Sequence, residues 1–203
     1  MWEELFKKHS LKEVKLSKPA VTKPGLRELA EAGAALGDPL PASYKAFCME
    51  IGPVVLLDNY RIYAPCAEND YADLVKSAMH WKQYSDKELE KYSWPAGVPK
   101  YSFPVNDLIV FADTLAGDNF GFYTKEKTAG DEYAVYMISS EEMKVDRVAD
   151  SFPDFIENVF FGQRLVDLGI FSDLGELKKT WEPFIQYRKK TPARKKKTLA
   201  KKK

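Results

Sequence analysis

Hydrophobic residues recur at helical spacing in three segments of the first half of the chain. Residues 26–36 place apolar side chains at i, i+3, i+4 and i+7, the spacing of an amphipathic helix that Gly37 would end. A second helix is predicted to start at Leu40-Pro41, because proline suits the first helical turn, and to stop at Gly52-Pro53. A third pattern covers residues 71–78, with Asn69 or Asp70 as the expected cap.

Between and after these helices, short apolar runs are typical of β-strands. Residues 54–57 and 60–63 flank a two-residue turn, and residues 133–138 and 145–148 form two further runs. The strongest signal is the stretch 108–124, in which two apolar runs flank a polar turn. This stretch predicts a central β-hairpin.

The remaining segments complete the predicted order of elements. Trp2, Leu5 and Phe6 indicate a short helix that docks on the domain, and residues 83–103 are predicted to be a long ordered loop. A capping box at residues 151–154 opens an apolar closing helix. One or two short helices are expected in residues 164–186, anchored by Leu165, Leu168, Phe171, Leu174, Leu177 and Trp181. This order predicts an α+β fold, with a mostly antiparallel central sheet flanked by N-terminal and C-terminal helices.

Composition adds a division of charge. The last sixteen residues, 188–203, hold ten basic residues and no acidic one, which leaves 21 basic against 30 acidic residues in the remainder. The body, residues 1–187, therefore carries a net charge of −9 and the basic tail, residues 188–203, carries +10. We expect one domain over 1–187 followed by a disordered tail, because the tail is too polar to bury surface.

The chain has few residues suited to catalysis or metal binding. It contains two histidines and two cysteines, and it has no phosphate-binding loop or hydrolase signature. Cys66 and His80 could bind a metal ion together, but no third or fourth metal ligand is evident. Asp113 and Asp118 are a weak candidate for a catalytic acid–base pair. We therefore expect a protein without enzymatic activity, cofactor or metal. We also expect a cytoplasmic location without membrane insertion, since the thiols suit a reducing compartment and no apolar run is long enough to span a bilayer.

Two stretches are candidates for binding. The polar turn of the central hairpin either serves as turn chemistry only or faces a partner. Aromatic residues around the long loop add amphipathic side chains of the kind that interfaces favour. The candidate partner-binding residues are Asp113, Thr114, Asp118, Asn119, Tyr60 and Trp94.

The basic tail is a candidate for nucleic-acid contact through phosphates, without sequence readout. The competing interpretation is a solvated tail, or one that folds back on the acidic body. The residues that would contact nucleic acid are Arg188, Lys189, Lys190, Arg194, Lys195, Lys196 and Lys197.

Three motifs together resemble the SUKH superfamily. They are Leu40-Pro41-x-x-Tyr44-x-x-Phe47 closing at Gly52, the hairpin with Gly117-Asp118 in its turn, and Ser151-Phe152-x-x-Phe155-Ile156. The sequence differs from the family in having Gly52-Pro53 where Gly-Gly is common, and Thr124 near a position that is often acidic.

The resemblance implies a SUKH-like fold and a protein-binding module without enzymatic activity. Its partner would be a protein, for example a co-encoded nuclease-type or deaminase-type toxin that the module neutralises as an immunity protein. Fungal relatives suggest a regulatory scaffold in cell-wall synthesis instead. A nucleic-acid-associated accessory protein that uses the basic tail is the alternative function.

Overall fold

A computed structural model describes residues 1–66, 68–83, 107–139, 144–167 and 178–184. The helices in these ranges are α1 (Trp2–Lys8), α2 (Leu26–Leu36), α3 (Ala42–Glu50), α4 (Leu74–Trp81), α6 (Phe152–Asp154), the π-helix η2 (Phe155–Phe160) and α7 (Arg164–Asp167). The strands are β1 (Lys12–Glu13), β2 (Val54–Leu56), β3 (Tyr60–Ile62), β4 (Leu108–Thr114), β5 (Asn119–Lys127), β6 (Tyr133–Ser139), β7 (Lys144–Ala149) and β8 (Thr180–Pro183). None of the described helices is both long and apolar enough to cross a membrane.

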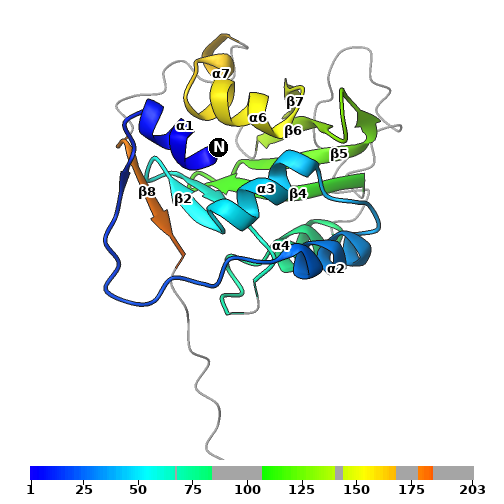
Figure 1. Ribbon diagram of the computed structural model, residues 1–203. Coiled ribbons are helices and arrows are strands. Elements are labelled where there is room, and N and C mark those ends of the chain that lie inside the picture. The colour runs from blue at the N-terminus through cyan, green and yellow to red at the C-terminus, as the bar shows by residue number, and fades with distance from the viewer. Residues whose placement is uncertain (67, 84–106, 140–143, 168–177, 185–203) are drawn as a thin grey trace, which may run out of the picture.

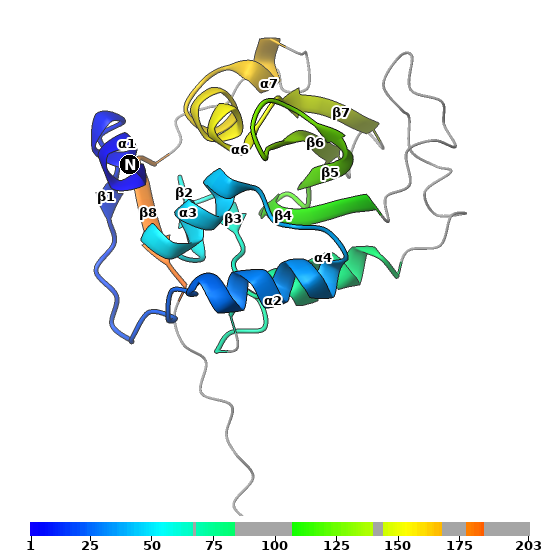
Figure 2. The ribbon, with the colours of Figure 1, turned by 45° about the vertical axis from the view of Figure 1, so that its right-hand side comes forward.

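One sheet organises these elements. The described strands follow the order β1-β8-β2-β3-β4-β5-β6-β7, and every pairing is antiparallel except that of β1 with β8. Helices α3 and α6 lie on one side of β4, and the pair α2 and α4 lies on the other (Figure 2). The predicted α+β class with a mostly antiparallel, SUKH-like sheet is confirmed (Figure 1).

Aromatic rings fill the space between the sheet and helices α3 and α6. Phe111 and Phe122 on neighbouring strands stack with ring centroids 4.0 Å apart, and Phe152 from α6 meets Phe111 edge-to-face at 5.5 Å. The hydroxyl of Tyr44 donates a hydrogen bond of 2.5 Å to the carbonyl of Tyr63, so the one polar atom of this ring has a partner. Each fully buried ring of this kind contributes about 2 kcal/mol through removal from water.

Helix α2 confirms the predicted N-terminal amphipathic helix, but its buried face is rotated from the expected one. Leu29, Ala32, Gly33 and Leu36 are buried, whereas Leu26 and Ala30 are exposed. Glycine suits position 33 because a Cβ there would lie 3.1 Å from the carbonyl oxygen of Asp38, closer than most Cβ contacts. The chain that leaves α2 therefore returns close along the helix and leads directly into α3.

The third predicted helix begins later than expected. Asp73 is the N-cap of α4 and accepts a 2.8 Å hydrogen bond from the Lys76 amide, so the predicted cap at Asn69 or Asp70 is wrong. The carboxamide of Asn69 instead accepts from the amide of Tyr71, 2.9 Å away, which makes a local turn. Tyr71 lies outside the helix and is 75% exposed.

At the C-terminal side, the closing helix is confirmed with two changes. Ser151 caps α6 by accepting from the Asp154 amide at 3.3 Å, while the Asp154 carboxylate accepts from Asp150 rather than from Ser151, so the capping box is incomplete. The helix then widens to a π-helix over Phe155–Phe160. Four predicted anchors, Leu168, Phe171, Leu174 and Leu177, lie outside the described residues.

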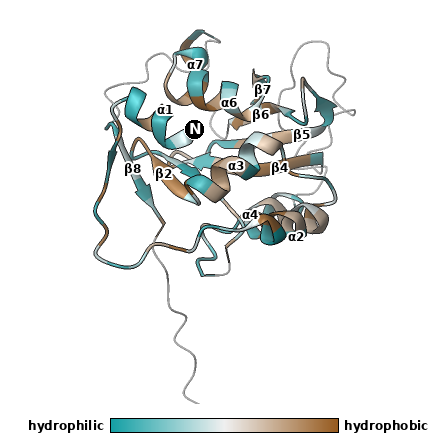
Figure 3. Cartoon of the chain, in the orientation of Figure 1, coloured by the Kyte–Doolittle hydropathy of each residue, from teal (hydrophilic) through white to brown (hydrophobic). Residues whose placement is uncertain are grey.

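Trp181 is in a strand, so its predicted place in a C-terminal helix is wrong. Strand β8 pairs with β2 on one side and with β1 on the other. Figure 3 shows a hydrophilic β8 beside a hydrophobic β2. The edge of β2 that does not pair with β3 provides a backbone partner for this short segment. The ring of Phe6 packs 5.6 Å from that of Trp181, and these two contacts make the segment a strand.

Candidate functional site

The turn of the central hairpin, residues 113–119, is tightly closed by its own polar groups. The Thr114 amide donates to the Asp118 carbonyl at 2.8 Å, and the Gly117 amide donates to the Thr114 carbonyl at 3.0 Å. Gly117 has a φ of 98°, which favours glycine at this position. Strand β4 continues through Thr114 and β5 starts at Asn119, so only four residues lie between the two strands.

Side chains of the hairpin turn reinforce the closure. The hydroxyl of Thr114 accepts from the Asp118 amide at 3.1 Å, and the amide nitrogen of the Asn119 side chain donates to the Gly117 carbonyl at 2.7 Å. The Leu115 amide also donates to the carbonyl of Asn59, 3.0 Å away in the turn between β2 and β3. Two adjacent turns are therefore fixed to each other at one end of the sheet.

Asp113 forms a bidentate ion pair with Arg61 on the neighbouring strand. The guanidinium Nε donates to one carboxylate oxygen at 2.7 Å, and a second guanidinium nitrogen donates to the other oxygen. The pair follows from strand register, since Arg61 and Asp113 are directly opposite in the β3–β4 ladder. The hydrogen bonds that Arg61 donates to Asp113 raise the pKa of Arg61. This geometry locks β3 to β4 beside the turn.

Two neighbouring aromatic residues extend this polar arrangement under α4. Burial, followed by the charge of Asp113, raises the pKa of Tyr63, so its hydroxyl stays protonated beside that carboxylate. On the same side of the sheet, the indole nitrogen of Trp81 donates to the Asn119 side-chain oxygen at 3.1 Å. Helix α4 is thus bonded to the first residue of β5.

The structure places five of the six predicted partner-binding residues, all but Trp94, at one end of the sheet, and four of them are buried. Asp113 is 7% exposed, and Thr114, Asp118 and Tyr60 are less exposed still. Tyr60 packs its ring 4.4 Å from that of Phe160, and burial, with the nearby charge of Asp118, raises its pKa to about 12. Direct contact of these four side chains with a partner stays a prediction.

What the hairpin turn exposes is its tip. Leu115 is 64% exposed, and Ala116 and Gly117 are exposed beside it. Asn119 is half-buried at the edge of the tip. Trp94 and the seven predicted nucleic-acid contacts between Arg188 and Lys197 lie outside the described residues.

Arg61 is the residue of this site that sequence reasoning missed. A charged residue stands inside the otherwise apolar run Tyr60-Arg61-Ile62-Tyr63, and such a position needs a counter-ion once the strand is covered. That signal was present, although the identity of the counter-ion depends on strand register. Among the described residues, no group of three or more His, Cys, Asp or Glu could hold a metal ion.

Comparison with known proteins supports the resemblance seen in the three motifs. A search of curated proteins found no match to the chain. The SMI1/KNR4 family (SUKH-1) matches residues 24–158, from the start of α2 into η2, and this region includes the whole hairpin site. Because the match spans well over half of the sequence, the protein belongs to the SMI1/KNR4 family (SUKH-1).

Proposed function

We propose that this protein is a toxin-immunity module that binds and neutralises a nuclease-type or deaminase-type toxin without catalysing a reaction. The observation that carries the proposal is the body's net charge of −9 in a chain of this family. Nuclease and deaminase toxins present basic surfaces to nucleic acid. An acidic body would occupy such a surface and associate faster through long-range attraction.

The hairpin tip is the part of the site through which the module would contact its partner. Leu115, Ala116 and Gly117 are exposed, while the buried side chains around them hold the turn in one shape. Asp113, Thr114, Asp118 and Tyr60 would contribute by fixing this shape, and Asn119 would add a contact at the edge of the tip. Trp94 would be a further contact. A preformed turn binds at a lower entropic cost than a flexible one.

The test is binding of the full chain to the toxin domain encoded beside it, measured at about 50 mM and about 300 mM salt. We expect tight binding that weakens at the higher salt concentration, and protection of cells that express the toxin. Absence of binding would overturn the immunity function. Binding that does not respond to salt would overturn the role of the acidic body.

Matched variants test the hairpin tip. Ala116→Arg places a long cation on the tip and should lower affinity for the toxin about tenfold. Ala129→Arg places the same side chain on the exposed turn that follows β5, where affinity should be unchanged. Equal affinities for the two variants would show that the partner binds elsewhere.

A second function, nucleic-acid association through the basic tail, is favoured by where the tail begins. The Phe184 amide donates to the Pro53 carbonyl at 3.2 Å, and the Phe184 carbonyl accepts from the Val21 amide at 2.8 Å. The +10 tail therefore starts four residues after a point that is bonded to the body. Removal of residues 188–203 should abolish retention on a DNA column, and unchanged retention would exclude this function.

A further inference from the structure

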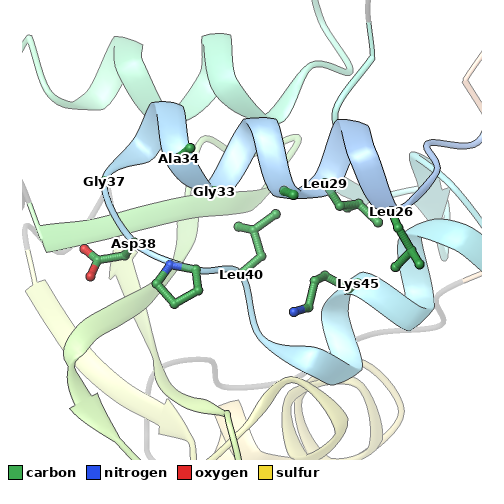
Figure 4. Close-up of a pocket in the computed structure, with 10 residues that line it drawn as sticks. Leu26, Leu29, Gly33, Ala34, Gly37, Asp38, Leu40 and Lys45 are labelled. Atoms are coloured by element: carbon green, nitrogen blue, oxygen red, sulfur yellow. The ribbon is translucent and has the colours of Figure 1, made fainter.

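A groove runs along the outer side of α2, on a face that the hairpin site does not include. It has a volume of about 550 Å³ and lies between α2 and the returning segment 38–45 (Figure 4). Leu29, Gly33 and Leu40 contribute to its lining together with the exposed residues of α2. The lining is mainly apolar, so water in this groove would be displaced favourably by an apolar surface.

The ridge of α2 beside the groove consists of Leu26, Ala30 and Ala34. These residues are spaced four apart, so they lie in one row along the helix, and all three are exposed. Leu26 is the largest of them and is 69% exposed. The two alanines leave room for another helix to approach closely along the same row.

The two ends of the row differ in shape. Leu26 projects at the N-terminal end of α2, whereas the opposite end is formed by Ala34 and Gly37. A Cβ at Gly37 would meet no atom within 4 Å, so the space beside it is open. Helix α2 therefore carries a projecting side chain, Leu26, at one end and an open space beside Ala34 at the other. Leu26 and Ala34 are eight residues apart, which is about 12 Å along the helix.

Two residues of opposite charge also line different parts of the groove. Lys45 lies on the Leu26 half of the groove, and Asp38 lies beyond Gly37 at the other end (Figure 4). Neither side chain forms an ion pair with another described residue, although Arg27 on the same helix pairs with Glu28 and Glu31. A copy of the same surface turned by 180° would bring its acidic end toward the half of the groove that holds Lys45.

We propose that the α2 groove is the interface of a symmetric dimer, in which α2 of one protomer packs antiparallel against α2 of a second copy. A two-fold axis at Ala30 brings Leu26 of each protomer into the open space beside Ala34 and Gly37 of the other. The same rotation brings Lys45 of each protomer toward Asp38 of the other. One surface thus supplies both halves of the contact, as an isologous interface requires.

The first test is sedimentation of the full chain over a concentration series from about 1 to about 200 μM, a range that covers weak dimers. The expected mass rises from 23.2 kDa toward twice that value. Ala34→Arg fills the open space and should leave a monomer throughout the series. Ala35→Arg, at an exposed position on another side of the same helix, should dimerise like the wild type. A monomeric wild type, or equal behaviour of the two variants, overturns the proposal.

A charge exchange tests the arrangement of the two protomers. Lys45→Glu places two acids together and should weaken the dimer about tenfold, and adding Asp38→Lys to that variant should restore it. Failure of the double variant to recover would overturn the pairing of these two residues. Urea unfolding of each variant shows whether its fold is intact.

Cross-linking tests the position of the symmetry axis. Ala30→Cys places the new thiols of the two protomers next to each other, so mild oxidation should give a covalent dimer in high yield. The native cysteines, Cys48 and Cys66, are both buried and offer little background. Ala35→Cys should give little covalent dimer, and a comparable yield from both variants would overturn the axis at Ala30.

Discussion

The hairpin turn and the α2 groove differ in where their polar groups find partners. In the hairpin turn, Asp113 is bonded to Arg61, and Thr114 is bonded to Asp118. In the α2 groove, Lys45 and Asp38 lack ionic partners among the described residues, and the exposed row beside them is apolar. In the hairpin turn the polar groups bond to each other and stabilise the shape of the turn. In the α2 groove the two charged side chains are available to another molecule. Polarity in the sequence therefore does not by itself locate a binding surface.

The largest expected difference between the two regions is in stability. Asp113→Asn keeps the shape of the side chain but leaves the half-buried Arg61 without its counter-charge, which should cost about 2 kcal/mol of unfolding free energy. Asp38→Asn in the α2 groove should change it by less than about 0.5 kcal/mol. Urea titration at a low protein concentration would measure both, and equal losses would contradict the comparison.

The second expected effect depends on pH and involves Tyr60. Its pKa is raised from 10.0 to about 12, so the folded state holds the phenol proton more tightly than the unfolded state does. This contribution to stability is fully present below pH 10 and is lost as the pH rises through about 12.

Tyr60→Phe cannot ionise, so its stability should fall less steeply than that of the wild type over this alkaline range. The difference should reach about 2 kcal/mol once the wild-type phenol ionises. Unfolding curves collected across the range would measure it. Identical alkaline slopes for the two proteins would show that Tyr60 ionises as easily folded as unfolded.

The smallest expected effect on stability belongs to Leu26. It is 69% exposed, so Leu26→Ala removes little buried surface within one protomer and should alter unfolding free energy by less than about 0.5 kcal/mol. The same change should still weaken self-association severalfold in the sedimentation series, because it removes the projecting side chain from the interface. A large loss of stability with unchanged association would reverse the assignment of this residue.

The spacing of apolar residues and of turn residues predicted most of the helices and hairpins whose contacts are between residues close in sequence. The Leu40-Pro41 helix and the strands of the central hairpin appear where spacing and turn residues place them. The turn before Tyr60 is also present, but it has three residues rather than the predicted two, because strand β2 ends at Leu56 and Leu57 joins the turn. The hairpin turn is shorter than the polar stretch indicated, because Asp113 and Thr114 continue strand β4. Their polar side chains are tolerated in the sheet since Arg61 and Asp118 pair with them.

The features that were missed depend on contacts between distant segments. Trp181 is part of a four-residue strand whose own sequence, Thr-Trp-Glu-Pro, has weak β-pattern, and it is ordered by pairing with β2 and β1. The bond between Arg61 and Asp113 needs the register of two strands, β3 and β4, that have 45 residues between them in the sequence. Two residues of the exposed row on α2, Leu26 and Ala30, were predicted to lie on the buried face of this helix. Helical spacing locates an apolar face but does not fix its rotation to within one residue.

The parallel pairing of β1 with β8 has a consequence for how the molecule is made. Lys12 pairs with Thr180, so this contact joins segments near the two ends of the described chain. During synthesis, β2 would have no neighbour on its outer side until the last of these segments leaves the ribosome. Contacts of such long sequence separation form late, and an uncovered strand edge can pair with other chains in the meantime. A nascent or truncated chain would therefore aggregate through an edge that the finished protein never exposes.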